Sequence, residues 1–201
     1  DFGYLLTGQM ARNEADRPSN WTYGTIARLP NRDGIFDDEK STVDAEAVEI
    51  VDGHALIAFE RFHRIQRYNL NQGLPQPMAA RFPHPIPSWE IRANEGFEAL
   101  LKSNANSVLG GALVVFTEGS INKAGNIFAA VLSGARQGVF FVQKRDDFKI
   151  TDAVSLPDGN ILLLERRFDM RRGVAMRLRK ILASDIKPNA TIDGDVVLDA
   201  D

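Results

Sequence analysis

Three segments of the chain share one pattern, and this internal repeat limits the possible folds more than any other feature of the sequence. Each segment has an acidic residue, a short aliphatic strand, a turn, and an apolar strand that ends in another acidic residue. Glu46, Glu98 and Asp152 hold the same place in the three segments, and about 50 residues separate each from the next, which is the period of a propeller blade. The repeat therefore predicts an all-β protein, a β-propeller built of four-stranded blades.

Short apolar or alternating runs, bounded by Gly, Asn, Asp and Pro, support this interpretation. Few windows keep apolar residues at the spacing of an amphipathic helix, so we expect little helix. Asp52-Gly53 and Asp158-Gly159 predict tight hairpin turns, because glycine accepts the positive φ that such turns require. The predicted strands are Tyr23–Leu29, Ala47–Val51, Ala55–Phe59, Ile65–Leu70, Ala112–Phe116, Ile127–Leu132, Gly138–Gln143, Ile161–Leu164 and Ala175–Ile181.

We expect one propeller domain over residues 1–201, forming part of a larger ring of about six blades and cut at both ends. The proline-rich stretch 73–88 is expected to cross between blades, because proline cannot donate a hydrogen bond within a central strand. Trp21 and Trp89 are expected to pack in the core. The approximate repeats are 1–43, 44–93, 94–149 and 150–201.

Composition excludes several classes of protein. The longest apolar runs fall far short of the roughly 20 residues of a membrane-spanning helix, and the absence of cysteine excludes disulfides and thiolate metal sites. The net charge of −3 gives no basic field for nucleic acid. The one dense basic run, residues 166–180, has a period-two pattern, so we expect Met176–Ile181 to be an outer strand with its charged side chains in solvent.

Residues at one repeat position converge around the channel of a propeller. Glu46, Glu98 and Asp152 would then form a ring of carboxylates, and calcium takes six to eight oxygen ligands of this kind. We therefore expect these three residues to bind a metal ion, with calcium as the candidate. The alternative is that the acids pair with neighbouring arginines or accept backbone N–H groups.

A second set of matching acids ends the next apolar strand of each repeat: Glu60, Glu118 and Glu165. We expect Glu60 and Glu165 to act in catalysis. His63 follows the same strand end as Glu60 and is the histidine best placed for proton transfer or phosphate contact, although a surface loop histidine is the simpler interpretation.

Two pairs of arginines follow these acids on matching segments. An arginine side chain binds phosphate or carboxylate through two parallel N–H groups, so arginines from several blades at one mouth suit an anionic substrate. The alternative is a ladder of glutamate–arginine pairs between blades. The predicted substrate-binding residues are Arg61, Arg64, Arg166 and Arg167.

Four segments carry a resemblance to a known family: DAEA (44–47), FERFHRI (59–65), NEGFEAL (94–100) and LPDGNILLLERRF (156–168). Together they resemble the phytase-like domain of bacterial proteins described by the esterase-like activity of phytase, over nearly the whole chain. The resemblance implies a β-propeller secreted to the periplasm.

With the arginines and acids above, the resemblance predicts a hydrolase that acts on a small phosphate ester at the channel mouth, with calcium as the candidate cofactor. The chain lacks the Gly-x-Ser-x-Gly motif of serine esterases. The alternative is a non-catalytic propeller that binds a ligand or a protein at its rim.

Overall fold

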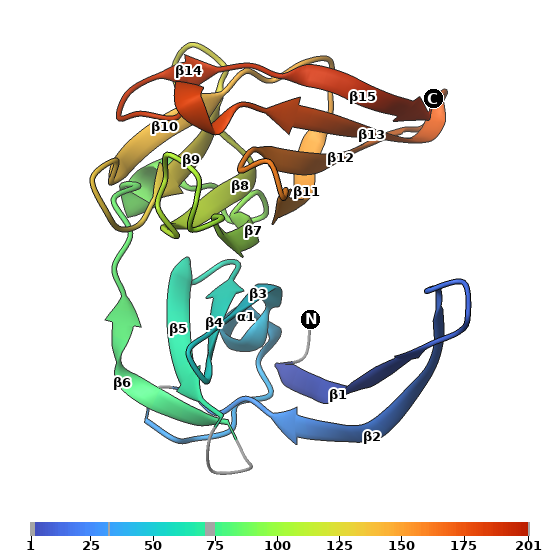
Figure 1. Ribbon diagram of the computed structural model, residues 1–201. Helices are drawn as coiled ribbons and strands as arrows, with labels where there is room; N and C mark the ends of the chain where they lie inside the picture. Colours follow the sequence, from blue (N-terminus) through green and yellow to red (C-terminus); the bar gives the residue numbers. More distant parts are fainter. Residues whose placement is uncertain (1–2, 32, 71–74, 201) are drawn as a thin grey trace.

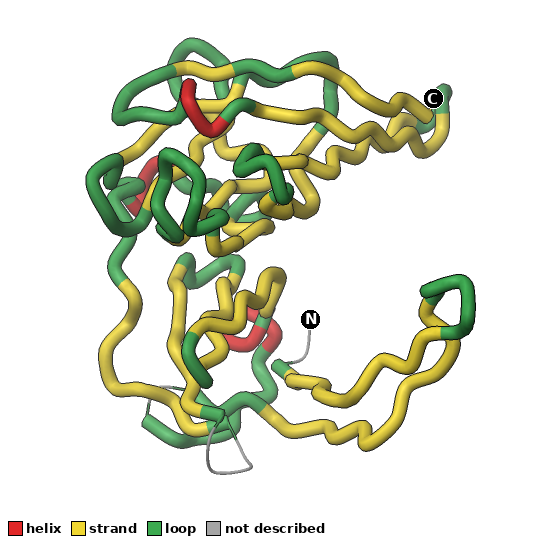
Figure 2. Tube along the Cα trace, in the orientation of Figure 1, coloured by secondary structure: helices red, strands yellow, loops and turns green. Residues whose placement is uncertain are grey.

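The computed structural model describes residues 3–31, 33–70 and 75–200. Strands dominate it, as Figure 2 shows. The helical segments among the described residues are the single turn α1 (Lys40–Val43) and two 3₁₀ turns, Ser88–Glu90 and Ala183–Asp185. The predicted all-β class is confirmed.

The strands form a hairpin and three larger sheets, which we call the first, second and third sheets in chain order. The hairpin joins β1 (Tyr4–Arg12) to β2 (Pro18–Arg28). The first sheet contains β3 (Ala45–Val51), β4 (His54–Phe59), β5 (Arg64–Asn69) and β6 (Gln76–Phe82). The second contains β7 (Phe97–Lys102), β8 (Leu113–Ile121), β9 (Ile127–Val131), β10 (Gly138–Val142) and β14 (Thr191–Ile192). The third contains β11 (Lys149–Ser155), β12 (Ile161–Asp169), β13 (Gly173–Ile181) and β15 (Asp195–Ala200).

The hairpin and the three sheets follow one another in an open arc (Figure 1). The first strand of each larger sheet, β3, β7 or β11, lies on the inner side of the arc and contacts the first strand of the next sheet. This is the order of blades in a propeller. The described residues do not close the arc into a ring.

Each interface between successive sheets holds its own apolar cluster, and strands in the middle of the stack are buried on both faces. In β4, Ile57 and Phe59 pack towards the hairpin, while Leu56 and Ala58 pack towards the second sheet. The side chains of β8 are divided in the same way, and those that face the third sheet meet Ile161 and Leu163 of β12 in the third cluster. Burial on both faces explains why the sequence shows continuous apolar runs here, and each fully buried aliphatic side chain contributes about 1.5–3 kcal/mol.

Two expectations about loops and aromatic residues need correction. Within the proline-rich stretch, Gln76–Phe82 forms β6, an edge strand that pairs with β5, whereas residues 73–74 lie outside the described residues. An edge strand tolerates Pro77 because its missing N–H faces no partner strand. Trp89 is 84% exposed and Trp21 is 49% exposed, so neither is a core residue.

The last part of the chain links the second and third sheets. Thr191 and Ile192 pair in parallel with Phe141 and Val142 of β10, and the chain then returns to pair β15 with β13. Two residues of the last repeat therefore belong to the sheet of the preceding one.

The arginines of β13 are buried, so the expectation of solvated charges on an outer strand is wrong. Arg177 and Arg179 point inward, and β13 lies between β12 and β15. Both guanidinium groups donate to the buried carboxylate of Glu165, at 2.6 and 2.5 Å. Arg179 also donates to the carbonyl of Gln143 and to Asp193, at 2.8 and 3.0 Å. These partners lie far away in the sequence, and they make burial of the arginines possible.

We expect Glu165→Gln to lower the free energy of unfolding by about 3 kcal/mol or more, because it leaves two buried guanidinium groups without their shared carboxylate. Urea denaturation at neutral pH measures this change. Asp147→Asn is the control, since Asp147 is 81% exposed, and we expect a change within about 0.5 kcal/mol. Equal denaturation midpoints for the two variants would contradict a structural role for this network.

Candidate active site at the inner strands

A β-bulge at the same place in each inner strand sets the direction of the predicted metal ligands. The pairing of β3 with β4 skips Glu46, and the pairing of β7 with β8 skips Glu98. In β11 the skipped residue is Thr151, so Asp152 lies one position beyond the bulge. A bulge changes the direction of a side chain, which then no longer follows the regular alternation between the two faces of the sheet. Glu46 and Glu98 are therefore equivalent, whereas Asp152 is exposed and lines a shallow hollow of the third sheet with apolar side chains.

The second set of acids divides in the same way. Glu60 and Glu118 occupy equivalent positions, because their N–H groups donate to the carbonyls of Asp44 and Gly96, at 2.8 and 2.7 Å. In the third sheet this position is held by Arg166, which pairs with Lys149. The acid of the third repeat, Glu165, lies one residue earlier, and its carboxylate accepts hydrogen bonds from the buried arginines Arg177 and Arg179.

Five acids gather at the inner strands of the first and second sheets, and we call them the acidic cluster: Asp44, Glu46, Glu60, Glu98 and Glu118. Three of them, Asp44, Glu46 and Glu60, each offer a carboxylate oxygen within 4.8 Å of the other two. Three carboxylates at this separation are a donor set for a hard cation.

Asp44 is the member of the acidic cluster that the sequence analysis did not select. It is 1% exposed, and its Oδ2 accepts the Nε–H of Arg61 at 3.1 Å. Its Oδ1 is buried and accepts no hydrogen bond from a basic or amide group among the described residues; Lys40 Nζ lies 3.7 Å away, and a hydrogen bond with Asp44 contributes to the raised pKa of Glu46. A buried carboxylate oxygen without such a donor is costly, and a cation bound between Asp44 and its neighbours would compensate for it. In the sequence, Asp44 could have been recognised as a site residue by its position immediately before the first strand of the repeat.

The carboxylates of the acidic cluster raise one another's pKa. Burial, followed by the charges of Glu46, Glu118 and Glu60, raises the pKa of Glu98 to about 8, and Arg166 opposes this shift. Burial raises the pKa of Glu46 and of Glu60 as well, and the charge of Asp44 adds to both. Glu98 therefore holds a proton at neutral pH.

At one edge of the acidic cluster the charges are neutralised. Lys149 Nζ lies 3.2 Å from both Glu95 and Glu118, and Arg92 lies 3.0 Å from Glu95. Burial alone would raise the pKa of Glu95, but the hydrogen bonds from Lys149 and Arg92 lower it. The alternative of acids paired with basic neighbours is therefore correct at this edge. It does not apply to Glu98, for which the described residues show no ion pair.

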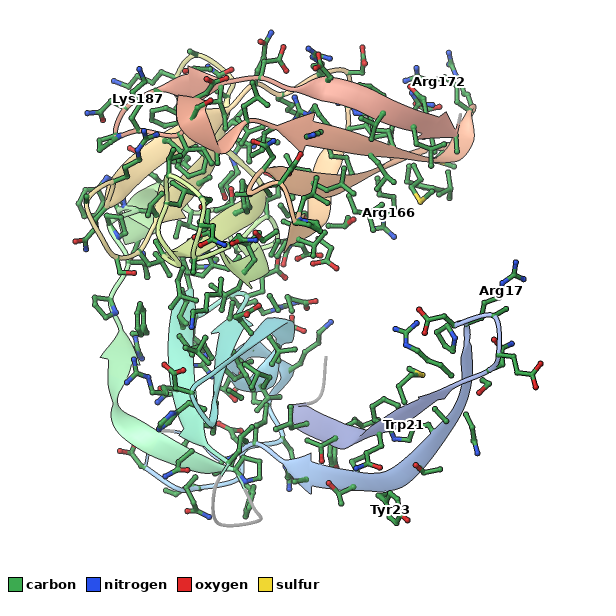
Figure 3. The ribbon with its side chains drawn as sticks, in the orientation of Figure 1. Arg17, Trp21, Tyr23, Arg166, Arg172 and Lys187 are labelled. Carbon is green, nitrogen blue, oxygen red and sulfur yellow. The ribbon has the colours of Figure 1, made fainter. Side chains whose placement is uncertain are left out.

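Two of the four predicted arginines lie beside the acidic cluster. Arg61 contacts Asp44, and the charge of Arg166 acts on Glu98. Arg166 is exposed on the third sheet (Figure 3). Arg167, on the opposite face of β12, is buried against the ring of Phe148 at 5.1 Å. The fourth, Arg64, points into a separate pocket.

His63 lies next to the acidic cluster on the far side of a glycine. A Cβ atom at Gly96 would come within 2.7 Å of His63 Nδ1 and 3.1 Å of Glu60 Cγ. Both side chains therefore pack closely against the backbone of Gly96. The ring of His63 is edge-on to Phe97, as is the ring of His84. Burial lowers the pKa of His63, and the nearby His84 lowers it further. His63 is therefore neutral at pH 7.

The fold is therefore all-β, with antiparallel sheets in an open arc and carboxylates collected at their inner strands. The family model for phytase-like proteins, described as esterase-like activity of phytase, matches residues 1–199, and the chain belongs to this family. The family predicted from the four sequence segments is confirmed, and its description names an esterase-like hydrolase activity. Comparison with curated proteins and with solved structures found no match. Among the described residues, no helix has the length and apolar character needed to span a membrane.

We expect Glu98→Gln to remove a pH dependence of stability. Because the folded-state pKa of Glu98 lies above its ordinary value, the contribution of Glu98 to stability is most favourable below about pH 4.5 and falls as pH rises towards 8. The variant cannot ionise, so its Tm should exceed that of the wild type at pH 8 and approach it at pH 4.5. Thermal melts across this range measure the difference, with Glu90→Gln as an exposed control. Parallel curves for wild type and Glu98→Gln would contradict the raised pKa.

Proposed function

We propose that the protein hydrolyses a phosphate ester at the acidic cluster, at the position of the channel mouth in a propeller. The observation that carries the proposal is the convergence of unneutralised carboxylates at the bulges of neighbouring inner strands. The family description supports a hydrolase. Strained or mutually repelling groups of this kind reduce stability, and they are typical of functional sites.

The residues present fit a divalent cation. Asp44, Glu46 and Glu60 would hold it, and the buried oxygen of Asp44 that lacks a basic or amide donor is the strongest sign of the fit. Calcium is the proposed ion, because every side-chain donor here is a carboxylate oxygen. When bound, such an ion supplies charge stabilisation at a phosphoryl oxygen.

The other side chains supply proton transfer and anion contact. Burial and the neighbouring carboxylates raise the pKa of Glu98 in the metal-free protein, so Glu98 is the proposed general acid, which gives its proton to the leaving oxygen of the ester as a water molecule attacks phosphorus. Arg61 and Arg166 flank the acidic cluster and bind the negatively charged oxygens of the substrate.

We expect Glu46→Gln to abolish stabilisation of the full chain by calcium and to lower kcat/KM by at least about a hundredfold. Glu98→Gln should lower kcat by a similar factor, because it removes the proton donor, while calcium stabilisation persists. Assays with 4-nitrophenyl phosphate, inositol hexakisphosphate and 4-nitrophenyl acetate, combined with thermal melts in calcium or chelator, measure both effects.

Glu49→Gln is the matched control, since Glu49 is a partly buried glutamate on the same strand as Glu46. It should leave activity and calcium stabilisation unchanged. If no ester is hydrolysed and calcium stabilises none of the proteins, the proposed hydrolase is wrong, and the acidic cluster belongs to a non-catalytic binding propeller.

A further inference from the structure

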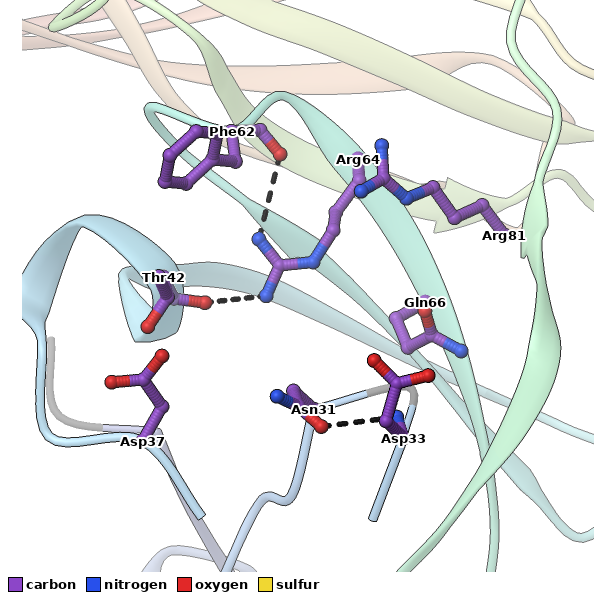
Figure 4. Close-up of a pocket in the computed structure, with 8 residues that line it drawn as sticks. All are labelled: Asn31, Asp33, Asp37, Thr42, Phe62, Arg64, Gln66 and Arg81. Atoms are coloured by element: carbon purple, nitrogen blue, oxygen red, sulfur yellow. Dashed lines mark hydrogen bonds between the residues drawn. The ribbon is translucent and has the colours of Figure 1, made fainter. Parts of the chain in front are cut away.

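A pocket of about 250 Å³ lies between the loop before α1 and the strands β5 and β6 of the first sheet (Figure 4). We call it the arginine pocket. It differs from the acidic cluster in charge, because it presents two cations and two carboxylates. The residues that define it are Asn31, Asp33, Asp37, Thr42, Arg64 and Arg81.

The guanidinium group of Arg64 is held in place by neutral partners. It donates to the backbone carbonyls of Thr42 and Phe62, at 2.5 and 3.4 Å, and lies 3.8 Å from the ring of Phe59. Carbonyls and an aromatic face orient a guanidinium without cancelling its charge. Arg64 therefore brings a fixed positive charge to the arginine pocket.

Arg81 adds a second positive charge to the arginine pocket. In Figure 4 the guanidinium group of Arg81 lies over the aliphatic part of the Arg64 side chain, whereas the guanidinium group of Arg64 is turned towards Thr42 and Phe62. Burial lowers the pKa of Arg64, and the charge of Arg81 lowers it further. Two guanidinium groups that line one pocket, and that have no carboxylate at ion-pair distance among the described residues, can bind an oxyanion.

The opposite wall carries the carboxylates. Asp37 accepts the N–H of Glu39 at 2.9 Å, and this bond, with one from Thr42, lowers the pKa of Asp37. Asp33 is positioned through its own N–H, which donates to Asn31 Oδ1 at 3.0 Å. Ionised carboxylates are acceptors only, so this wall favours a ligand with hydroxyl or ammonium donors.

We propose that the arginine pocket binds a small molecule with an oxyanion at one end, held by Arg64 and Arg81, and hydrogen-bond donors at the other, held by Asp37. A volume of about 250 Å³ suits a ligand of few atoms. A polyanion is disfavoured, because its outer charges would face the two carboxylates. Polyol phosphates and amino acids both have the required chemistry.

This site is independent of the proposed hydrolase. Arg61 points to Asp44 of the acidic cluster, whereas Arg64, three residues later, points to Thr42 and the arginine pocket. Binding here needs no divalent cation, so it can be measured in chelator and in the Glu46→Gln variant.

Isothermal titration of the full chain in chelator tests the proposal with two matched pairs of probes. Glycine differs from acetate by its ammonium group, and glycerol 3-phosphate differs from methyl phosphate by its hydroxyls. We expect at least one probe with donors to bind about tenfold more tightly than its partner. Arg81→Gln should weaken that binding by about tenfold, and Asp37→Asn should remove the preference.

Arg17→Gln, at the exposed tip of the hairpin, is the control and should bind as the wild type does. Arg81 is exposed, so its substitution should leave the fold intact, which circular dichroism verifies. Preference for glycine identifies an amino-acid ligand, and preference for glycerol 3-phosphate identifies a polyol phosphate. The proposal is overturned if neither donor-bearing probe binds more tightly than its partner, or if Arg81→Gln binds as the wild type does.

Discussion

The site depends on a backbone irregularity, the β-bulge that each inner strand carries at the same point. An antiparallel strand alternates its side chains between two faces, and apolar residues of β3 and β7 pack into the clusters between the sheets. A skipped residue leaves that alternation, and the two skipped residues, Glu46 and Glu98, lie close enough for the charge of Glu46 to act on Glu98. The stacking of sheets then brings the two bulges together, and the acids before and after them complete the acidic cluster.

Two buried or partly buried carboxylates in this protein, Glu165 and Glu98, have their charges compensated in different ways. Glu165 is buried with two arginines that donate to both its oxygens, so its charge is compensated within the fold. Glu98 has three neighbouring carboxylates and is held neutral by a proton. The first group stabilises the third sheet and its links to the second. The second group costs stability as pH rises, and such an arrangement is typical of a functional site.

The sequence was sufficient for the all-β class, most strands of the three sheets and the meeting of Glu46 with Glu98, because these depend on the repeat and on local pattern. The sequence was insufficient where a shift of one residue in strand register decides on which face of a sheet a side chain lies. Asp152 was aligned with Glu98, but the bulge in β11 falls at Thr151. The arginines of β13 were expected in solvent, because their partners lie in other strands and loops. The arginine pocket likewise joins a loop to β5 and β6, and no local pattern indicates it.

The inner strands bring together Glu46 and Glu98, two carboxylates that have no ion-pair partner among the described residues. NMR titration of the full chain, with ¹³C-labelled glutamate carboxyls and Glu98 assigned through Glu98→Gln, measures this directly. We expect an apparent pKa of about 8 for Glu98 in chelator and a clear decrease when calcium is added. Titration of Glu98 near its ordinary value of 4.5, with no response to calcium, would contradict it.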